Sequence, residues 1–212
     1  MPNFEIEEKC QGIVAGIDEA GRGPWVGPVV AGAVMFHKKP IHPYLATHLD
    51  DSKKLTAKKR EELYTVIEDE AHKQNLSFGI GEASAQEIDA LNILEATFLA
   101  MYRAVQKLTT QPDIALIDGN RTPKNFICPN KCIIKGDSKS YSIAAASIVA
   151  KVYRDRLMQN LALKYPYYGF EKNAGYGTKE HIEALKKYGI CEEHRKSYKP
   201  IKQIIEEKSE KK

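Results

Sequence analysis

Residues 13–36 read IVAGIDEAGRGPWVGPVVAGAVMF, two apolar runs separated by a pair of acids and a glycine-rich turn. The apolar runs at 13–17 and 29–36 predict two strands, and the short turn between them predicts a hairpin. The carboxylates of Asp18 and Glu19 then stand at the tip of the first strand. The rest of the chain is expected to bring further acids and basic groups to this tip.

Asp18 and Glu19 are adjacent, and adjacent side chains on a regular strand point to opposite faces of a sheet. Both can face one site only if the strand ends or bulges there, which Gly21 and Gly23 make easy, or if the longer Glu19 side chain reaches around. The alternative is that Glu19 is a solvent-facing residue, and the pattern leaves both interpretations open.

Two later strands also end in an acid beside a glycine. The apolar run 114–117 leads into Asp118, and a short strand expected at 133–135 leads into Asp137. Strand ends that lie together in an α/β sheet surround a single crevice. The sequence therefore predicts that Asp118 and Asp137 meet Asp18 at one edge of a sheet.

Helices are expected between the strands, with a further strand at 76–81. Their positions follow from apolar residues at helical spacing and from Ser, Thr or Asn at their starts. The expected helices cover 57–74 after the N-cap Thr56, a short segment after Ser84, a longer one from Asn92, the small-residue-rich segment 140–165, then 178–187 and 200–208. Residues 36–47 and 167–178 are expected to be loops.

Length and charge fit one main domain with a basic extension. The chain has 212 residues, and residues 195–212 carry seven basic and three acidic side chains, which accounts for the whole net charge of +4. We therefore expect a main domain at 1–190 and a basic helical C-terminal extension at 191–212. The basic excess allows a polyanion partner, and a solvated tail is the alternative.

No stretch approaches the roughly 20 apolar residues of a membrane helix, and the acidic N-terminus lacks the apolar core of a secretion signal. These features favour a cytoplasmic protein with reduced cysteines. Cys128 and Cys132 have a C-x-x-x-C spacing without a second ligand pair, so ordinary thiols are favoured over a zinc site.

Several carboxylates within reach of one another resist ionising together, and a hard divalent cation relieves that repulsion. Mg²⁺ and Mn²⁺ prefer oxygen ligands, commonly carboxylates completed by water and phosphate oxygens. Two such ions about 4 Å apart can activate a water and stabilise the leaving oxygen in phosphodiester cleavage. The three strand-end acids therefore favour metal-dependent phosphodiester chemistry.

The glycine loop matches neither common nucleotide fingerprint. Gly21-Arg22-Gly23 gives G-x-G, but Gly27 comes one position late for the dinucleotide motif, and a Walker A loop is absent. The loop amides can still approach a sugar–phosphate backbone closely with Arg22 beside them, which suits a reader of the ribose 2′-hydroxyl.

Three polar residues near helix starts could add phosphate contacts. Lys53 and Lys54 precede the helix at 57–74 and could bind phosphate, although a solvated charge pair is equally common. Ser138 lies just before the helix at 140–165, where free amides and the helix dipole favour anions.

Nine motifs, taken in order from about residue 14 to residue 200, resemble ribonuclease HII. They are GIDEAGRGP at 16–24, DSKKL at 51–55, LIDGN at 116–120, KGDS at 135–138, IAAASI at 143–148, AKVYRD at 150–155, YPYYGF at 165–170, GYGT at 175–178 and HRKSY at 194–198. Each motif is weak alone, whereas the ordered set is specific. Tyr198 stands where the family usually has phenylalanine.

The resemblance implies a ribonuclease H-like α/β fold with a mixed central sheet flanked by helices and a helical C-terminal region, and makes 1–190 the catalytic domain. It implies a metal-dependent endonuclease that cleaves the RNA strand of RNA–DNA hybrids. It also implies incision 5′ of ribonucleotides embedded in duplex DNA, leaving 3′-hydroxyl and 5′-phosphate ends. Carried over by position, the catalytic and metal-binding acids are Asp18, Glu19, Asp118 and Asp137, with Mn²⁺ or Mg²⁺ in a two-metal site.

The resemblance also places the loop at 21–23 beside the ribose and phosphate at the cut, and Tyr176 at the RNA–DNA junction as a stacking residue. The candidate substrate-binding residues are Gly21, Arg22, Gly23, Lys53, Lys54, Ser138 and Tyr176. Asp155 matches a recurrent family residue and is interpreted as structural, paired with Arg154 or Lys151.

Two other functions stay open. A non-catalytic nucleic-acid-binding module driven by the basic tail would bind in a salt-sensitive way without cleavage, but it leaves the strand-end acids unexplained. A magnesium-dependent phosphohydrolase of small esters would need neither Tyr176 nor the tail. The expected partners are an RNA–DNA hybrid and ribonucleotide-containing duplex DNA, with no membrane, and the protein is expected to act as a monomer.

Overall fold

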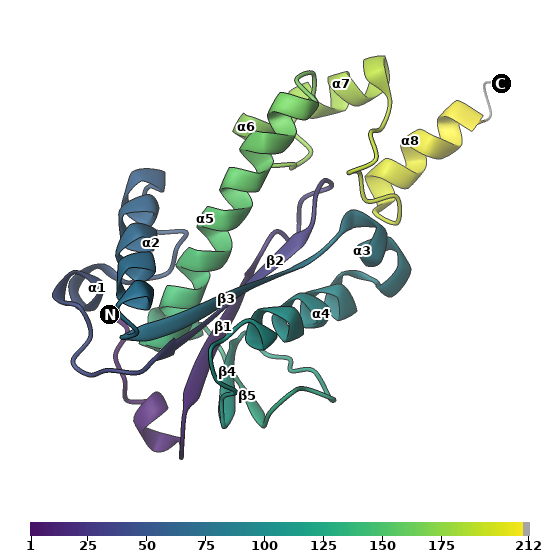
Figure 1. Cartoon of the computed structure of the whole chain (residues 1–212). Helices are drawn as coiled ribbons and strands as arrows, with labels where there is room; N and C mark the ends of the chain where they lie inside the picture. Colours follow the sequence, from purple (N-terminus) through teal and green to yellow (C-terminus); the bar gives the residue numbers. More distant parts are fainter. Residues whose placement is uncertain (210–212) are drawn as a thin grey trace.

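The computed structural model describes residues 1–209, in which a mixed five-stranded sheet has helices on both faces (Figure 1). The strands are β1 (Val14–Ala20), β2 (Val29–Phe36), β3 (Leu76–Ala83), β4 (Ile114–Asp118) and β5 (Asn130–Ile133), in the order β3-β2-β1-β4-β5. β2 is antiparallel to both β1 and β3, whereas β1, β4 and β5 are parallel. The predicted hairpin and mixed sheet are confirmed.

The predicted caps begin four of the helices. The helical elements are η1 (Glu7–Lys9), α1 (Pro43–His48), α2 (Ala57–His72), α3 (Ala85–Leu91), α4 (Ile93–Gln106), η2 (Gly136–Ser138), α5 (Tyr141–Lys164), α6 (Phe170–Asn173), α7 (Lys179–Tyr188) and α8 (Lys199–Ser209). The side chains of Thr56, Ser84, Asn92 and Thr178 each accept a hydrogen bond from an amide of the first turn. Local sequence therefore sets where these helices start.

Three local predictions are wrong. The stretch 36–47 is not entirely a loop, because α1 begins within it with His42 as its N-cap. The strand predicted at 133–135 is β5, which ends earlier because Lys135 adopts a left-handed conformation, with φ 55°. The stretch 167–178 contains the one-turn helix α6, which is too short to show a helical period in the sequence.

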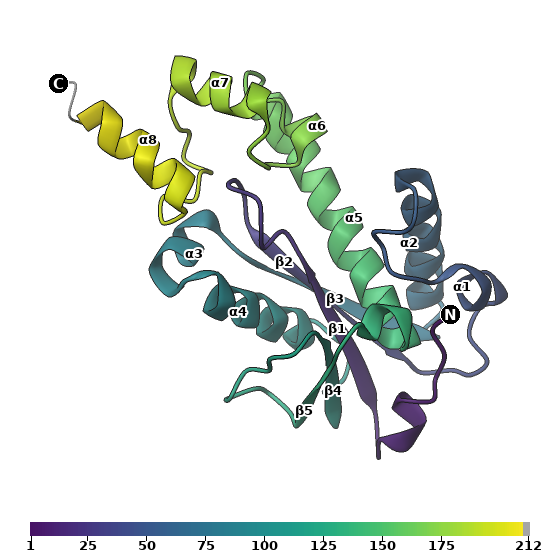
Figure 2. The ribbon, with the colours of Figure 1, turned by 180° about the vertical axis from the view of Figure 1, so that it is seen from behind.

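The sheet separates two apolar cores, and successive residues of each strand alternate between them. Ala15 and Ile17 of β1 pack in the core beneath α4. Gly16 faces α5, where an added Cβ would come within 2.1 Å of the Ser142 backbone. α5 crosses one face of the sheet and α4 the other, as the two opposite views show (Figure 1, Figure 2). The absence of a side chain at Gly16 lets the start of α5 approach the centre of the sheet.

The C-terminal helices form a third core beyond the tip of the β1–β2 hairpin (Figure 1). Val26 from the hairpin turn, Met158 from the far half of α5 and Ile201 of α8 are buried together there. The predicted helical C-terminal region is therefore present, whereas a domain boundary at residue 191 stays a prediction. Residues 210–212 of the predicted extension lie outside the described part of the chain.

α5 has 24 residues. Across residues 1–209, no helix combines the length and apolar character needed to cross a membrane.

Candidate active site

The strand register brings two of the predicted acids together. β1 and β4 are parallel neighbours in which Ile17 pairs with Ile117, so Asp18 and Asp118 follow one residue later on adjacent strands. Ile17 and Ile117 are buried in the core beneath α4. Because side chains alternate along a strand, Asp18 and Asp118 both point to the opposite face, the side of α5.

Asp137 reaches the same point from η2, the short helix between β5 and α5. One carboxylate oxygen from each of Asp18, Asp118 and Asp137 lies within 4.8 Å of the other two, and we call these residues the carboxylate cluster. Asp118 Oδ1 accepts a 2.6 Å hydrogen bond from the Gly136 amide, which fixes η2 beside the end of β4. The structure thus brings together the three acids that the sequence placed at strand ends.

The surroundings of the carboxylate cluster resist its ionisation. Burial raises the pKa of Asp18 well above its usual value, and the charges of Glu19 and Asp118 add to this effect. Burial, followed by the charge of Asp118, also raises the pKa of Asp137. A divalent cation between these oxygens would relieve the repulsion, so the donor set fits magnesium or manganese.

Glu19 lies outside the carboxylate cluster. β1 pairs with β2 in regular register from Gly16 to Ala20, so the strand neither ends nor bulges at the two adjacent acids. Glu19 therefore leaves the strand on the α4 side, where its carboxylate forms a 3.2 Å ion pair with Arg22, and it borders both the cleft with Asp18 and a second cleft with Asp118. Burial raises the pKa of Glu19, and Arg22 partly offsets that rise. A metal-ligand role for Glu19 stays a prediction, since it lies beside the carboxylate cluster rather than within it.

The turn at 21–28 is fixed by two buried arginines from distant parts of the chain, and we call it the arginine-held turn. The fully buried Arg195 guanidinium donates at 2.6 to 3.0 Å to four backbone carbonyls, those of Gly21, Arg22, Pro24 and Gly27. Arg154 donates to the carbonyls of Val26 and Pro28 at 3.1 and 3.4 Å. Among residues 1–209, neither guanidinium forms an ion pair with a carboxylate.

Burial lowers the pKa of Arg154 to about 10, so this side chain still carries a positive charge at neutral pH. The pKa of Arg195 is lowered for the same reason. Two positive charges therefore lie directly behind the turn, next to an acidic site. A polyanionic substrate that approaches the turn meets the field of two cations, neither of which forms an ion pair within residues 1–209.

Tyr176 lies at the same cleft as the arginine-held turn. Its ring is about half exposed and stands 3.4 Å from the position that a Cβ on Gly23 would take. The Tyr176 carbonyl lies 2.9 Å from Nδ1 of the buried His181, whose Nε2 lies 3.1 Å from Nε2 of His194. Since His194 directly precedes Arg195, one buried network supports both Tyr176 and the turn.

The other predicted substrate contacts lie at the rim. Lys53 borders the cleft with Tyr176, and its charge partly offsets the raised pKa of Glu19 and of Asp137. The Lys54 ammonium is ion-paired with Asp50 at 3.0 Å. The Ser138 hydroxyl donates to a backbone carbonyl at 2.9 Å. Lys54 and Ser138 therefore have partners within the protein, whereas Lys53 is placed to meet a ligand.

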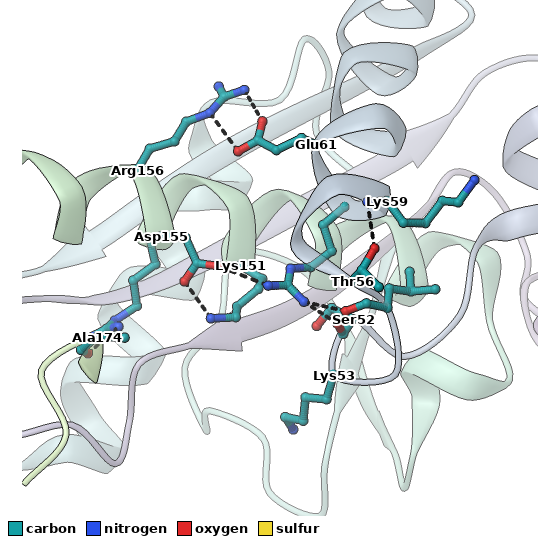
Figure 3. Close-up of polar contacts among 12 residues, drawn as sticks. Ser52, Lys53, Thr56, Lys59, Glu61, Lys151, Asp155, Arg156 and Ala174 are labelled. Atoms are coloured by element: carbon teal, nitrogen blue, oxygen red, sulfur yellow. Dashed lines mark hydrogen bonds and ion pairs between the residues drawn. The ribbon is translucent and has the colours of Figure 1, made fainter. Parts of the chain in front are cut away.

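Most of the cationic lining of this cleft could not be found from the sequence. The cleft has a volume of about 480 Å³ and is lined by the acids Asp18 and Glu19 together with five cationic side chains, Arg22, Lys53, Arg60, Lys151 and Arg154. Asp155 pairs with Lys151 and with Arg60 rather than with Arg154 (Figure 3). The i,i+4 spacing of Lys151 and Asp155 is a local signal for the first pair, but nothing local indicates Arg60.

A mixed sheet in the order β3-β2-β1-β4-β5, with acids from β1 and β4 facing a long helix, is the architecture of the ribonuclease H-like fold. Solved structures share this fold. Ribonuclease H2 from Pyrococcus horikoshii superposes with a TM-score of 0.74 at 30% identity, covering 92% of this chain and 98% of that one. Bst-RNase HIII in complex with Mn²⁺ gives 0.70 at 17% identity, over 97% of this chain and 73% of that one.

The chain belongs to the ribonuclease HII family, whose model matches residues 15–201. Ribonuclease HII from Rhodospirillum rubrum is 50% identical over 205 residues, covering 97% of this chain and 92% of that protein. Ribonuclease HII from Endomicrobium trichonymphae is 54% identical over 192 residues, covering 91% and 88%. The resemblance found in the sequence is confirmed, and the chain is an enzyme of the ribonuclease H class, a hydrolase that acts as a nuclease.

Proposed function

We propose that this enzyme cleaves the RNA strand of RNA–DNA hybrids and incises 5′ of ribonucleotides embedded in duplex DNA, leaving 3′-hydroxyl and 5′-phosphate ends. The observation that carries the proposal is the presence of two unlike groups in one cleft. Asp18 borders the same cleft as the loop at 21–23 and Tyr176. Acids that can hold a divalent cation therefore adjoin a backbone loop and an aromatic ring that can contact a sugar and a base.

Asp18, Asp118 and Asp137 would hold the metal, because their oxygens already lie within reach of one another. When bound, Mg²⁺ or Mn²⁺ supplies the charge that activates water and stabilises the leaving oxygen in phosphodiester hydrolysis. A two-metal site needs further ligands, and Glu19 is the candidate because its pKa responds to the charge of Asp118. The role of the protein is to keep these acids together against their repulsion.

The arginine-held turn would recognise the ribose. Its carbonyls are directed inward to Arg195 and Arg154, so its backbone keeps one position when a substrate approaches. A rigid backbone can distinguish a ribose 2′-hydroxyl, which donates and accepts hydrogen bonds, from the hydrogen of a deoxyribose. Tyr176 beside it is exposed enough to stack on the neighbouring base.

The test uses three labelled duplexes: one with a single embedded ribonucleotide, one uniform RNA–DNA hybrid and one of DNA alone. We expect cleavage of the first two with Mg²⁺ or Mn²⁺, none in EDTA, and none of the third. Salt-sensitive binding without cleavage would instead identify a binding module. Hydrolysis of p-nitrophenyl phosphate without duplex cleavage would identify a phosphohydrolase of small esters.

Asp118→Asn tests the assignment of the acids. The amide keeps the size of the side chain but loses its charge, so the cleavage rate should fall about 10³-fold or more while duplex binding persists. Wild-type cleavage by this variant with Mg²⁺ would remove Asp118 from the site.

We further propose a monomer acting in the cytoplasm, with 1–190 as the catalytic domain and 191–212 as a basic extension. Arg195 lies within that extension and yet fixes the turn at 21–28, so the extension would complete the catalytic domain. Light scattering of the purified protein tests the monomer, and a dimeric mass would contradict it.

A further inference from the structure

We propose that Asp155 is a positioning residue that acts through Arg60 to fix Lys53 at the cleft. This proposal rests on the proposed function, in which Lys53 would contact the substrate backbone. Asp155 lies on α5 behind the cleft and does not border it. Its two carboxylate oxygens bind different cations. Oδ1 accepts from Lys151 Nζ at 2.5 Å, and Oδ2 accepts from Arg60 Nη2 at 3.3 Å.

Arg60 carries the constraint from α5 to the turn that bears Lys53. Its Nη1 donates to the carbonyls of Ser52 and Leu55, at 3.0 and 2.7 Å. These two carbonyls lie on either side of Lys53, so the guanidinium spans the turn. Figure 3 labels Asp155 at one end of these contacts and Ser52 at the other, with the Lys53 side chain extending away from them.

The remaining hydrogen bonds of the turn are internal. The Asp51 side chain accepts from the Lys53 amide at 2.9 Å, and the Asp51 carbonyl accepts from the Lys54 amide at 3.0 Å. Such bonds set the shape of the turn but not its position relative to the sheet. Apart from the packing of Leu55 against the core, the position of Lys53 therefore depends on Arg60, and the direction of Arg60 depends on Asp155.

The link is more than an ordinary surface ion pair. The side chains of Arg60 and Asp155 are 13% and 26% exposed, so water competes little for their charges. Lys151, four residues before Asp155 on the same helix, occupies the other carboxylate oxygen and holds the carboxylate toward Arg60. Without Asp155, two cations bordering one cleft would repel each other and Arg60 would lose its fixed direction.

The structure offers a matched control on the same two helices. Glu61 of α2 and Arg156 of α5 form a 2.6 Å ion pair in which both side chains are 45% exposed (Figure 3). Neither residue borders the cleft. Glu61→Gln therefore breaks an α2–α5 ion pair without touching the turn that carries Lys53.

The experiment measures steady-state cleavage of a duplex with one embedded ribonucleotide, at several salt concentrations, for wild type, Asp155→Asn and Glu61→Gln. We expect Asp155→Asn to raise KM about tenfold with kcat within about twofold, because a ground-state contact is lost. The slope of log KM against log salt should fall by about 1, the loss of one phosphate contact. Glu61→Gln should leave KM, kcat and slope as in wild type.

A double-mutant cycle with Lys53→Ala distinguishes positioning from general weakening. If Asp155 acts through Lys53, Asp155→Asn should change KM less than about twofold in the Lys53→Ala background. Full multiplication of the two effects would overturn the proposal, as would a wild-type KM and salt slope for Asp155→Asn.

Arg60→Lys provides a second route if Asp155→Asn does not fold. It keeps the charge but cannot span both carbonyls, so it should raise KM in the same way, and a wild-type KM would overturn the proposal. Failure of the proposed function is distinguishable, because in that case the wild-type enzyme would not cleave the duplex.

Discussion

Asp18 of the carboxylate cluster and the arginine-held turn border one cleft, and the charges of these two regions are balanced in opposite ways. In the cluster, three acids lie within 4.8 Å of one another, and burial raises the pKa of Asp18 and of Asp137. In the turn, two buried guanidiniums bind six backbone carbonyls. A bound cation would complete the cluster, whereas the turn is completed by the protein itself.

This difference teaches how one fold separates two tasks. A site binds a cation tightly only if no group of the protein already neutralises its acids. The unneutralised acids repel one another, which lowers the stability of the fold. In the function proposed above, the turn distinguishes a ribose from a deoxyribose, and such a surface gains from the rigidity that buried, fully bonded polar groups provide. The two regions should therefore respond in opposite directions when a charge is removed.

The largest effect is expected in the carboxylate cluster. Asp18→Asn should lower the cleavage rate about 10³-fold or more. In EDTA the same variant should be more stable than wild type, by about 0.5–2 kcal/mol, because the amide removes a buried charge that the folded state disfavours. Urea unfolding in EDTA measures the stability of the metal-free protein, and urea unfolding in Mg²⁺ measures its stability with the cation present. Mg²⁺ should stabilise wild type more than the variant, and a variant less stable than wild type in EDTA would contradict this view of the cluster.

Removing a charge from the arginine-held turn should have the opposite effect on folding. Arg195→Met should lower the free energy of unfolding by about 3 kcal/mol or more, because each carbonyl left without a donor costs about 1–3 kcal/mol. Lys196→Met, at the exposed neighbouring residue, should change it by less than about 0.5 kcal/mol. Equal stabilities for the two variants in urea would show that Arg195 does not support the turn.

A fall in pH should also change the stability contributions of the two regions in opposite directions. The groups concerned are Asp18 in the cluster and His194, which precedes the arginine that holds the turn. Burial lowers the pKa of His194 to about 4, so in the folded protein it stays neutral between about pH 6.5 and 4, where the unfolded chain takes up a proton. Its contribution is complete above pH 6.5 and falls by about 1.4 kcal/mol per pH unit below it. Asp18, with a raised pKa, contributes stability at low pH that is lost as the pH rises through its folded value.

Variants separate these two opposed contributions. We expect His194→Gln to reduce the stability that the protein loses between pH 7.5 and 5. We expect Asp18→Asn to remove part of the stability that protonation of Asp18 adds as the pH falls. Both are measured by urea unfolding in EDTA. Parallel pH curves for wild type and His194→Gln would show that the histidine is not the source.

The smallest effect is expected at Tyr176, which borders both regions but supports neither. Tyr176→Ala should change unfolding free energy by less than about 0.5 kcal/mol, since the ring is half exposed. It should lower the preference for an RNA–DNA junction over a uniform hybrid about tenfold, within the range for a lost base–aromatic stack. The ratio of kcat/KM on the two substrates measures it, and an unchanged ratio would withdraw the junction role.

The sequence predicted the sheet and the convergence of Asp18, Asp118 and Asp137, because each acid directly follows an apolar strand or lies next to one. It could not decide the orientation of Glu19, which depends on how far β1 continues to pair with β2. Periodicity describes the faces of a strand but does not locate its end.

Local sequence patterns do not reveal the two arginines that hold the turn. Arg154 lies within a helical pattern and Arg195 follows a histidine in a basic stretch, so both resemble ordinary surface cations in sequence. Their burial depends on carbonyls that belong to residues 21–28, more than a hundred positions earlier. Contacts between residues so far apart in the sequence arise from tertiary packing, and neither secondary-structure propensity nor residue spacing indicates them.

The distance along the chain between Arg195 and its turn also sets an order during biosynthesis. The carbonyls that Arg195 binds belong to residues 168 to 174 positions earlier. The ribosome therefore synthesises β1, β4 and η2, with all three clustered acids, before it adds Arg195, whose side chain fixes the turn. The growing polypeptide therefore contains the three clustered acids well before it contains the arginine that holds the turn for which we propose ribose recognition.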